Sequence, residues 1–143
     1  MKFLEPITGK SWHCEDVHPV MQQKLHLSFM LEPMHNGKIL KISRYCDELN
    51  NHTDGYCYYD PMKKEIAIIS LNSNGNYSKG YIIPDEGKIL VYGQTVFPDK
   101  TIEFKNTLEI NSDGKLEDKY FWFDGEKWNA GHSRVYEYSE ENL

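Results

Sequence analysis

Residue pairs that form tight turns recur along the whole chain and divide it into short segments. Each pair joins an acidic residue or an asparagine to a glycine: Asn36-Gly37, Asp54-Gly55, Asn74-Gly75, Glu86-Gly87, Asp113-Gly114 and Asp124-Gly125. Asp60-Pro61 and Pro98-Asp99 mark two further breaks. Asn-Gly and Asp-Gly accept the positive φ that tight hairpins need. The recurrence therefore predicts a series of successive β-hairpins.

Between these turns, apolar and polar residues alternate with a period of two. In residues 101–110, one face carries Asn106 among the apolar side chains Ile102, Phe104, Leu108 and Ile110. Such a strand turns one face to a core and the other to water. We predict ten strands, near residues 10–17, 24–33, 38–46, 55–60, 65–72, 76–83, 88–97, 101–111, 115–123 and 132–139.

The short links between these strands leave no room for parallel crossovers, which need a dozen or more residues. Closing an antiparallel meander removes both of its exposed edges. We therefore predict an all-β fold in which residues 1–143 form one closed antiparallel up-and-down β-barrel of about ten strands. At most one short helical turn is expected, near residues 18–23. A two-sheet sandwich is the structural alternative.

Composition excludes several classes of function. The net charge is −6, and the 16 Lys and Arg residues form no basic stripe, so we expect no nucleic-acid partner. No stretch has the ~18 apolar residues of a membrane helix, and the first residues lack the apolar run of a signal peptide. We therefore expect a cytoplasmic protein whose three cysteines, Cys14, Cys46 and Cys57, are reduced thiols.

No motif for catalysis or metal binding is present, and we predict no cofactor. The six histidines show neither HxH nor HExxH spacing, and the chain has no GxSxG element. A haem-binding barrel needs a single inward histidine, and His132 could serve as one. An enzyme whose site assembles in space from distant residues is a further alternative.

The two ends of the chain carry a family resemblance. Gly9-Lys10-Ser11-Trp12 opens the first strand, and the segment from His132 to Glu137 lies in the last. These segments resemble the calycin superfamily, whose members open with a Gly-x-Trp element and place an Arg or Lys on the final strand. The terminal Arg-x-Tyr-Glu is similar to the end of fatty-acid-binding proteins, and Tyr58-Tyr59-Asp60-Pro61 resembles small bacterial lipocalin-like domains.

The resemblance implies a final-strand cation that packs across the opening tryptophan and closes one end of the barrel. In this sequence that contact would join Arg134 to Trp12. Fatty-acid-binding proteins use a second arginine for a carboxylate, two strands before the last. The sequence offers no counterpart there, where Asn106 is the inward polar residue that we predict.

Alternation on the last strand points His132, Arg134 and Tyr136 into the barrel. The guanidinium fork of an arginine suits a carboxylate or a phosphate, and a tyrosine hydroxyl can donate to the same anion. The other predicted ligand-binding residues are Asn106, Tyr120 and Trp122. For Arg134 both roles stay open: barrel closure over Trp12, and contact with a ligand.

Two functional hypotheses follow from this fold. The first is binding of a small amphipathic or apolar ligand, with or without a carboxylate, in a cavity of the barrel. The second is a structural or protein-interaction barrel whose interior is solid. The two differ in the interior, since a cavity is required by the first and excluded by the second.

Overall fold

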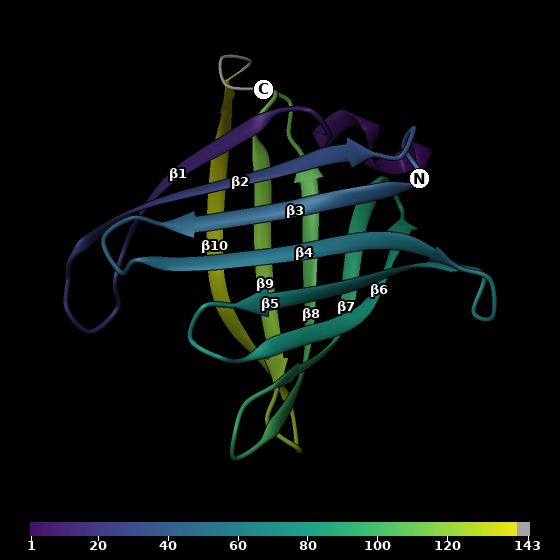
Figure 1. The fold of residues 1–143 in the computed structure, drawn as a ribbon. Coiled ribbons are helices and arrows are strands. Elements are labelled where there is room, and N and C mark those ends of the chain that lie inside the picture. Colours follow the sequence, from purple (N-terminus) through teal and green to yellow (C-terminus); the bar gives the residue numbers. More distant parts are fainter. Residues whose placement is uncertain (140–143) are drawn as a thin grey trace.

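The computed structural model describes residues 1–139, which form ten antiparallel strands closed into an up-and-down barrel (Figure 1). Each strand pairs with the next along the chain, and β1 also pairs with β10. This closed architecture is consistent with a calycin-like fold. The strands are β1 (Ser11–Val17), β2 (Lys24–Met34), β3 (Ile39–Cys46), β4 (Asn51–Asp60), β5 (Glu65–Asn72), β6 (Tyr77–Asp85), β7 (Lys88–Val96), β8 (Thr101–Ile110), β9 (Leu116–Phe123) and β10 (Trp128–Ser139).

The predicted fold class and strand number are confirmed, but one predicted turn is wrong. Asp54-Gly55 lies inside β4, which therefore starts at Asn51 and not at residue 55. A Cβ atom on Gly55 would lie 2.5 Å from the carbonyl oxygen of Ile69 on β5. Gly55 is thus required by the close approach of two strands, and not by a turn.

The helical element of the described chain lies at the N terminus, where η1 (Lys2–Ile7) is a 3-10 helix. Residues 18–23, where we expected any helical turn to lie, form a turn in which the Gln22 N–H donates to the His18 carbonyl over 3.0 Å. The η1 side chains Leu4 and Ile7 are buried in the barrel core. The indole N–H of Trp12 donates to the Ile7 carbonyl over 3.1 Å, which ties η1 to β1.

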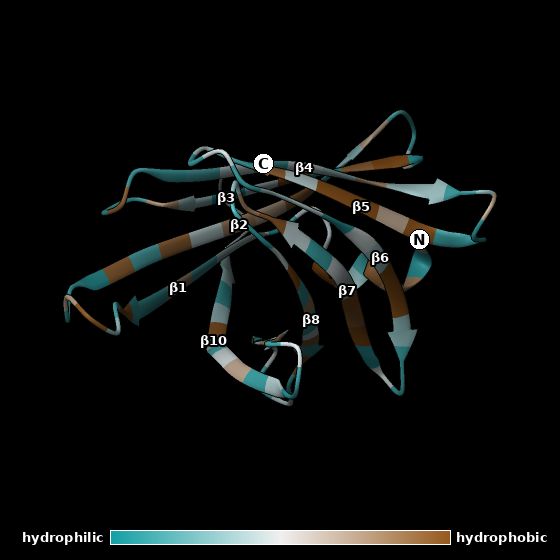
Figure 2. Ribbon diagram, turned by 90° about the horizontal axis from the view of Figure 1, so that it is seen from below, coloured by the Kyte–Doolittle hydropathy of each residue, from teal (hydrophilic) through white to brown (hydrophobic). Residues whose placement is uncertain are grey.

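The interior changes character along the barrel axis. Near η1 it is apolar, as Trp12 on β1, Leu40 on β3 and Leu116 on β9 show. Further along the same strands, the inward positions carry Asp16, Arg44 and Asp118. Figure 2 shows the period of two as alternating brown and teal segments along β2. Alternation thus places both apolar and charged side chains inside, and the charged ones gather in the half of the barrel away from η1.

Candidate functional site

Two cavities lie in the polar half of the barrel. The outer chamber has a volume of about 210 Å³, and its lining includes Arg44, Asp118, Arg134 and Tyr136 together with Leu25 and Leu49. The inner chamber has a volume of about 110 Å³ and is lined by Arg44, Phe104, Asn106, Tyr120 and His132 among others. Arg44 lines both chambers and therefore stands where the two meet.

Arg44 reaches the interior because it shares the inward face of β3 with Leu40 and Ile42, which are both buried. Its guanidinium carbon lies 5.7 Å from the centroid of the Phe29 ring, on the strand beside it. Within residues 1–139, the Arg44 side chain makes no hydrogen bond or ion pair with another residue. Sequence reasoning missed this residue, although the alternation of Leu40, Ile42, Arg44 and Cys46 carries the signal.

Arg134 also points inward and lines the outer chamber, but its charge is paired. Its Nε–H donates to Oδ2 of Asp16 on β1 over 2.9 Å. Partial burial opposes ionisation of Asp16, but the Arg134 bond, the Val17 N–H and the charges of Arg134 and His132 together hold the pKa of Asp16 below its usual value. This pair bridges β1 and β10 beyond the segment Ser11–His13, where their backbones pair.

The predicted packing of Arg134 over Trp12 is wrong. Trp12 lies opposite Tyr138, four residues further along β10 than Arg134, which is roughly 13 Å at the rise of a β-strand. The Tyr138 ring meets the Trp12 ring edge-on at 5.4 Å, and the cation near the Trp12 ring is the Lys10 ammonium, at 5.9 Å. Trp12 is fully buried and contributes to the closed end of the barrel without Arg134.

Asp118 is the centre of a buried polar cluster on neighbouring strands. Its Oδ2 lies 3.1 Å from Nε2 of His132, and its Oδ1 accepts a hydrogen bond from the amide of Asn106. The Asn106 amide also donates to the Lys119 carbonyl over 2.8 Å. Burial of Asp118 opposes its charge, but the His132 bond, the charges of His132 and Arg44, and the Asn106 bond together hold its pKa below the usual value. Asn106 is thus engaged within the protein.

A break in the pairing of β9 and β10 brings His132 into this cluster. The register shifts between Ala130 and Ser133, and β10 begins at Trp128 and not at residue 132 as predicted. Gly131 lies at this point against Tyr120, where a Cβ atom would be 2.6 Å from the ring. The bulge therefore allows the Tyr120 and His132 rings to stack, with centroids 5.3 Å apart.

The remaining predicted residues also lie on inward faces. Tyr136 is buried, and its ring meets Phe29 edge-on at 5.9 Å. Burial raises the pKa of the Tyr136 hydroxyl, which keeps it protonated and able to donate. Trp122 shares the Tyr120 face of β9 but lies opposite Phe104, and it is not part of the lining of either chamber.

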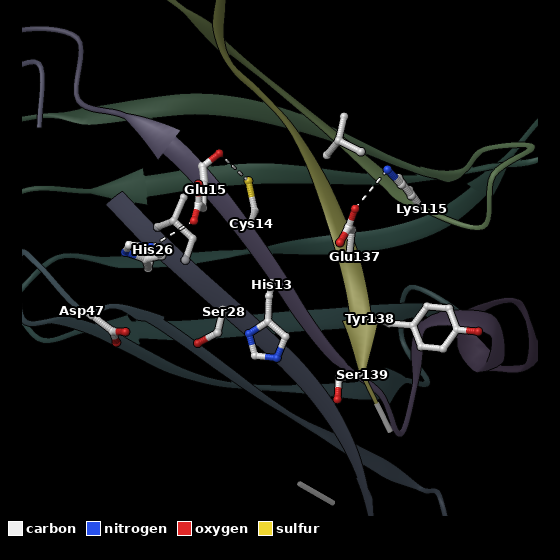
Figure 3. A pocket seen from close by; sticks show the side chains of 12 residues that line it. His13, Cys14, Glu15, His26, Ser28, Asp47, Lys115, Glu137, Tyr138 and Ser139 are labelled. Carbon is white, nitrogen blue, oxygen red and sulfur yellow. Dashed lines mark hydrogen bonds and ion pairs between the residues drawn. The ribbon is translucent and has the colours of Figure 1, made fainter. Parts of the chain in front are cut away.

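The largest cavity, about 830 Å³, is an open cleft on the outer surface above β1, β2 and β10 (Figure 3). Two pairs of charged side chains line it: Nζ of Lys115 lies 3.0 Å from Oε1 of Glu137, and Nε2 of His26 lies 3.2 Å from Oε1 of Glu15. Among residues 1–139 no group of three or more His, Cys, Asp or Glu is placed to hold a metal ion. We therefore place the candidate site in the two interior chambers.

Comparison with known proteins assigns this chain to no family, so its class is described by the fold and the two interior chambers. No protein-family model matches this chain, and no curated protein matches it. In the described part of the chain, no helix has the length and apolar character needed to span a bilayer. The class is thus that of closed antiparallel β-barrels whose interior is apolar at one end and polar at the other.

Proposed function

We propose that this protein is a cytoplasmic, calycin-like binding protein that reversibly holds a small amphipathic acid inside its barrel. The observation that carries the proposal is Arg44, a cation that makes no hydrogen bond or ion pair within residues 1–139 and that lines both interior chambers. Arg44 is exposed and lines the outer chamber, so an incoming anion can reach its guanidinium. A ligand carboxylate supplies that anion.

The other charges of the interior support this assignment. Arg134 is paired with Asp16, and the Asp118 carboxylate lies against His132, so these four groups have hydrogen-bond partners within the protein. Arg44 is left with its planar fork of donors, which matches the two oxygens of a carboxylate. The Tyr136 hydroxyl belongs to the same chamber and can donate to the same group.

The chamber volumes limit the size of the ligand. Pockets for drug-sized molecules measure roughly 300–1,000 Å³, and each chamber here is smaller. A compact or medium-chain acid therefore fits better than a long fatty acid. The inner chamber mixes Ile68 and Phe104 with Tyr120 and His132, so it suits a tail that is not purely apolar. The presence of two chambers speaks against the alternative of a solid barrel.

Calorimetric titration with straight-chain carboxylates of increasing length, each matched by the alcohol of equal length, tests the proposal. We expect the carboxylates to bind more tightly, with affinity highest at an intermediate length. Arg44→Met should weaken carboxylate binding about 10- to 100-fold, the value of a hydrogen-bonded charge, and should leave the alcohols unchanged. Lys41→Met, on the outward face of the same strand, is the matched control.

Two results would contradict the proposal. The first is equal affinity of the wild-type protein for acid and alcohol at every length. The second is an unchanged preference for the acid in Arg44→Met. Native mass spectrometry of freshly purified protein adds an independent check, because a co-purified acid should be lost in the Arg44→Met protein.

A further inference from the structure

The outer face of β4 to β7 carries a further cavity, which faces away from the barrel interior. This tyrosine hollow has a volume of about 460 Å³, and its characteristic lining residues are Tyr58, Lys63, Ala67, Lys79, Tyr81 and Tyr92. Exposed aromatic and aliphatic side chains continue it on the same face, namely Tyr56, Ile69, Leu71 and Tyr77. Contiguous exposed apolar surface of this kind is typical of sites that bind a ligand or a partner.

The register of four strands explains why the surface is hollowed. Tyr58, Ala67, Tyr81 and Tyr92 lie opposite one another in a row across β4, β5, β6 and β7. Ala67 has only a methyl side chain, whereas its neighbours on β4 and β6 carry aromatic rings. The surface is therefore lower at β5 than at the two strands beside it. Ala67, which is itself buried, forms the floor between Tyr58 and Tyr81.

Two of the tyrosine rings are held in place by carboxylates. The Tyr81 hydroxyl donates to Asp60 over 3.1 Å, and the Tyr92 hydroxyl donates to Glu65 over 2.7 Å. Their ring centroids lie 6.0 Å apart, with 35° between the planes. Rings that are already fixed lose little conformational freedom when a ligand packs on them.

The charges around the tyrosine hollow are balanced. The Lys63 ammonium lies 4.9 Å from the centroid of the Tyr81 ring, and Lys79 lines the same cavity. Neither lysine forms an ion pair within residues 1–139. The carboxylates of Asp60 and Glu65, which lie opposite each other on β4 and β5, stand beside the same tyrosines. Two cations and two carboxylates leave no net charge to attract a phosphate or a nucleic acid.

We propose that the tyrosine hollow binds a neutral saccharide. The C–H groups on one face of a sugar ring carry the partial positive charge that the negative face of an aromatic ring attracts. The lysines and Gln94 of the lining can donate to sugar hydroxyls. Asp60 and Glu65, which accept from the Tyr81 and Tyr92 hydroxyls beside the hollow, have further oxygens that can accept from a sugar. A site with fixed aromatic faces and a few polar groups of both kinds fits this chemistry.

This site is independent of the interior chambers. Ala67 and Ile69 point outward from β5, whereas Ser70 of the same strand lines the inner chamber, and Ile68 is the residue that the two linings share. Both sites can therefore be occupied at once. Arg44→Met should leave saccharide binding unchanged, which separates a failure of one site from a failure of the other.

Titration of ¹⁵N-labelled protein with neutral tetrasaccharides (cello-, malto- and chito-oligosaccharide) tests the proposal. Tetragalacturonate serves as the anionic comparison. At least one neutral probe should shift amide signals around Ala67, Lys79 to Tyr81 and Tyr92. Tyr81→Leu and Tyr92→Leu, which keep apolar volume but remove the ring, should each weaken binding about tenfold. Tyr92→Phe keeps the ring and should change affinity by no more than about threefold.

Phe121→Leu is the matched control, because Phe121 belongs to the same row of the sheet on β9 but lies outside the tyrosine hollow. It should bind the probe as the wild type does. The proposal is overturned by the absence of shifts with every neutral probe, or by binding of tetragalacturonate alone. It is also overturned if sedimentation shows a dimer that Tyr81→Leu dissociates, since the hollow would then be an interface with a second copy.

Discussion

At the scale of single residues, two arginines enter the same chamber with different surroundings. Arg134 meets the Asp16 carboxylate at 2.9 Å, whereas Arg44 faces the Phe29 ring. The surroundings differ because the strand beside Arg134 offers the carboxylate of Asp16, whereas the strand beside Arg44 offers the ring of Phe29. Arg134 therefore joins β10 to β1 through Asp16, and Arg44 is the residue that we propose to meet a ligand.

A double-mutant cycle on Arg134 and Asp16 checks the first assignment. We expect Arg134→Met and Asp16→Asn each to lower the free energy of unfolding, with a coupling of about 1 kcal/mol for this half-buried pair. Arg134→Met combined with Trp12→Phe should be additive to within about 0.5 kcal/mol, because the side chains do not meet. Urea unfolding of the wild type, the three single variants and the two double variants measures both couplings. Coupling of Arg134 to Trp12, without coupling to Asp16, would contradict this assignment and support the packing of Arg134 over Trp12 that the sequence predicted.

The inward set of this site could be predicted from the sequence, but its pairing could not. The alternation of residue types within a single strand was enough to place Arg134, Tyr136 and Tyr120 on inner faces, because it needs no information from other strands. The Asp16 partner of Arg134 is 118 residues away in the chain, and the register between the first and last strands decides it. Nothing within either strand specifies that register.

The Asp118 cluster should make the stability of the fold depend on pH. The pKa of the Asp118 carboxyl is lowered in the folded protein, so the ionised carboxylate stabilises the fold at pH values above the ordinary Asp pKa of about 3.9. This contribution is lost as the pH falls through that value toward the lower folded pKa. Asp118→Asn should therefore be destabilised at pH 7 by about 1.5–3 kcal/mol and should approach the wild type in acid. Urea titrations between pH 3 and 7 measure this difference; Glu117→Gln, which faces outward on β9, should show no such trend.

At the scale of secondary-structure elements, glycines perform two different tasks that look alike in sequence. Gly37 and Gly75 have φ values of +81° and +98° in turns, as their Asn-Gly pairs predict. Gly55 follows an aspartate in the same way but lies inside a strand. The pattern of a single segment cannot reveal a neighbouring strand that comes close, so this turn was predicted wrongly while the flanking strands were predicted well.

The most crowded glycines join β6 to β7. Gly80 and Gly93 lie opposite each other, and a Cβ on Gly80 would be 1.9 Å from the Tyr92 carbonyl oxygen. Gly80→Ala should force the two strands apart and cost about 3 kcal/mol or more, or prevent folding. Gly37→Asn, where no neighbour would meet the new side chain and asparagine accepts the left-handed conformation, should cost less than about 1 kcal/mol. Thermal unfolding distinguishes the two, and equal effects would contradict the packing argument.

At the scale of the whole molecule, one end of the barrel is closed and the other is polar. η1 and Trp12 form an apolar seal, whereas the charged half keeps two chambers beside Arg44. The core that stabilises the fold is thus separated along the axis from the groups proposed to bind a ligand. Changes at Arg44 should therefore alter binding without unfolding the barrel.

The three thiols test whether this closed molecule opens as a unit. Cys46 and Cys57 are buried, and burial raises the pKa of Cys57 to about 12, while burial also raises the pKa of the half-buried Cys14. Because the thiolate is the reactive form, Ellman's reagent should modify Cys14 slowly and leave Cys46 and Cys57 untouched in the native protein. In urea, the two buried thiols should react together, at the concentrations where the barrel unfolds. A Cys14→Ser protein isolates their signal, and mass spectrometry assigns each modified residue. Modification of Cys57 in native buffer as fast as that of Cys14 would show that β4 opens locally, against the closed register of the barrel.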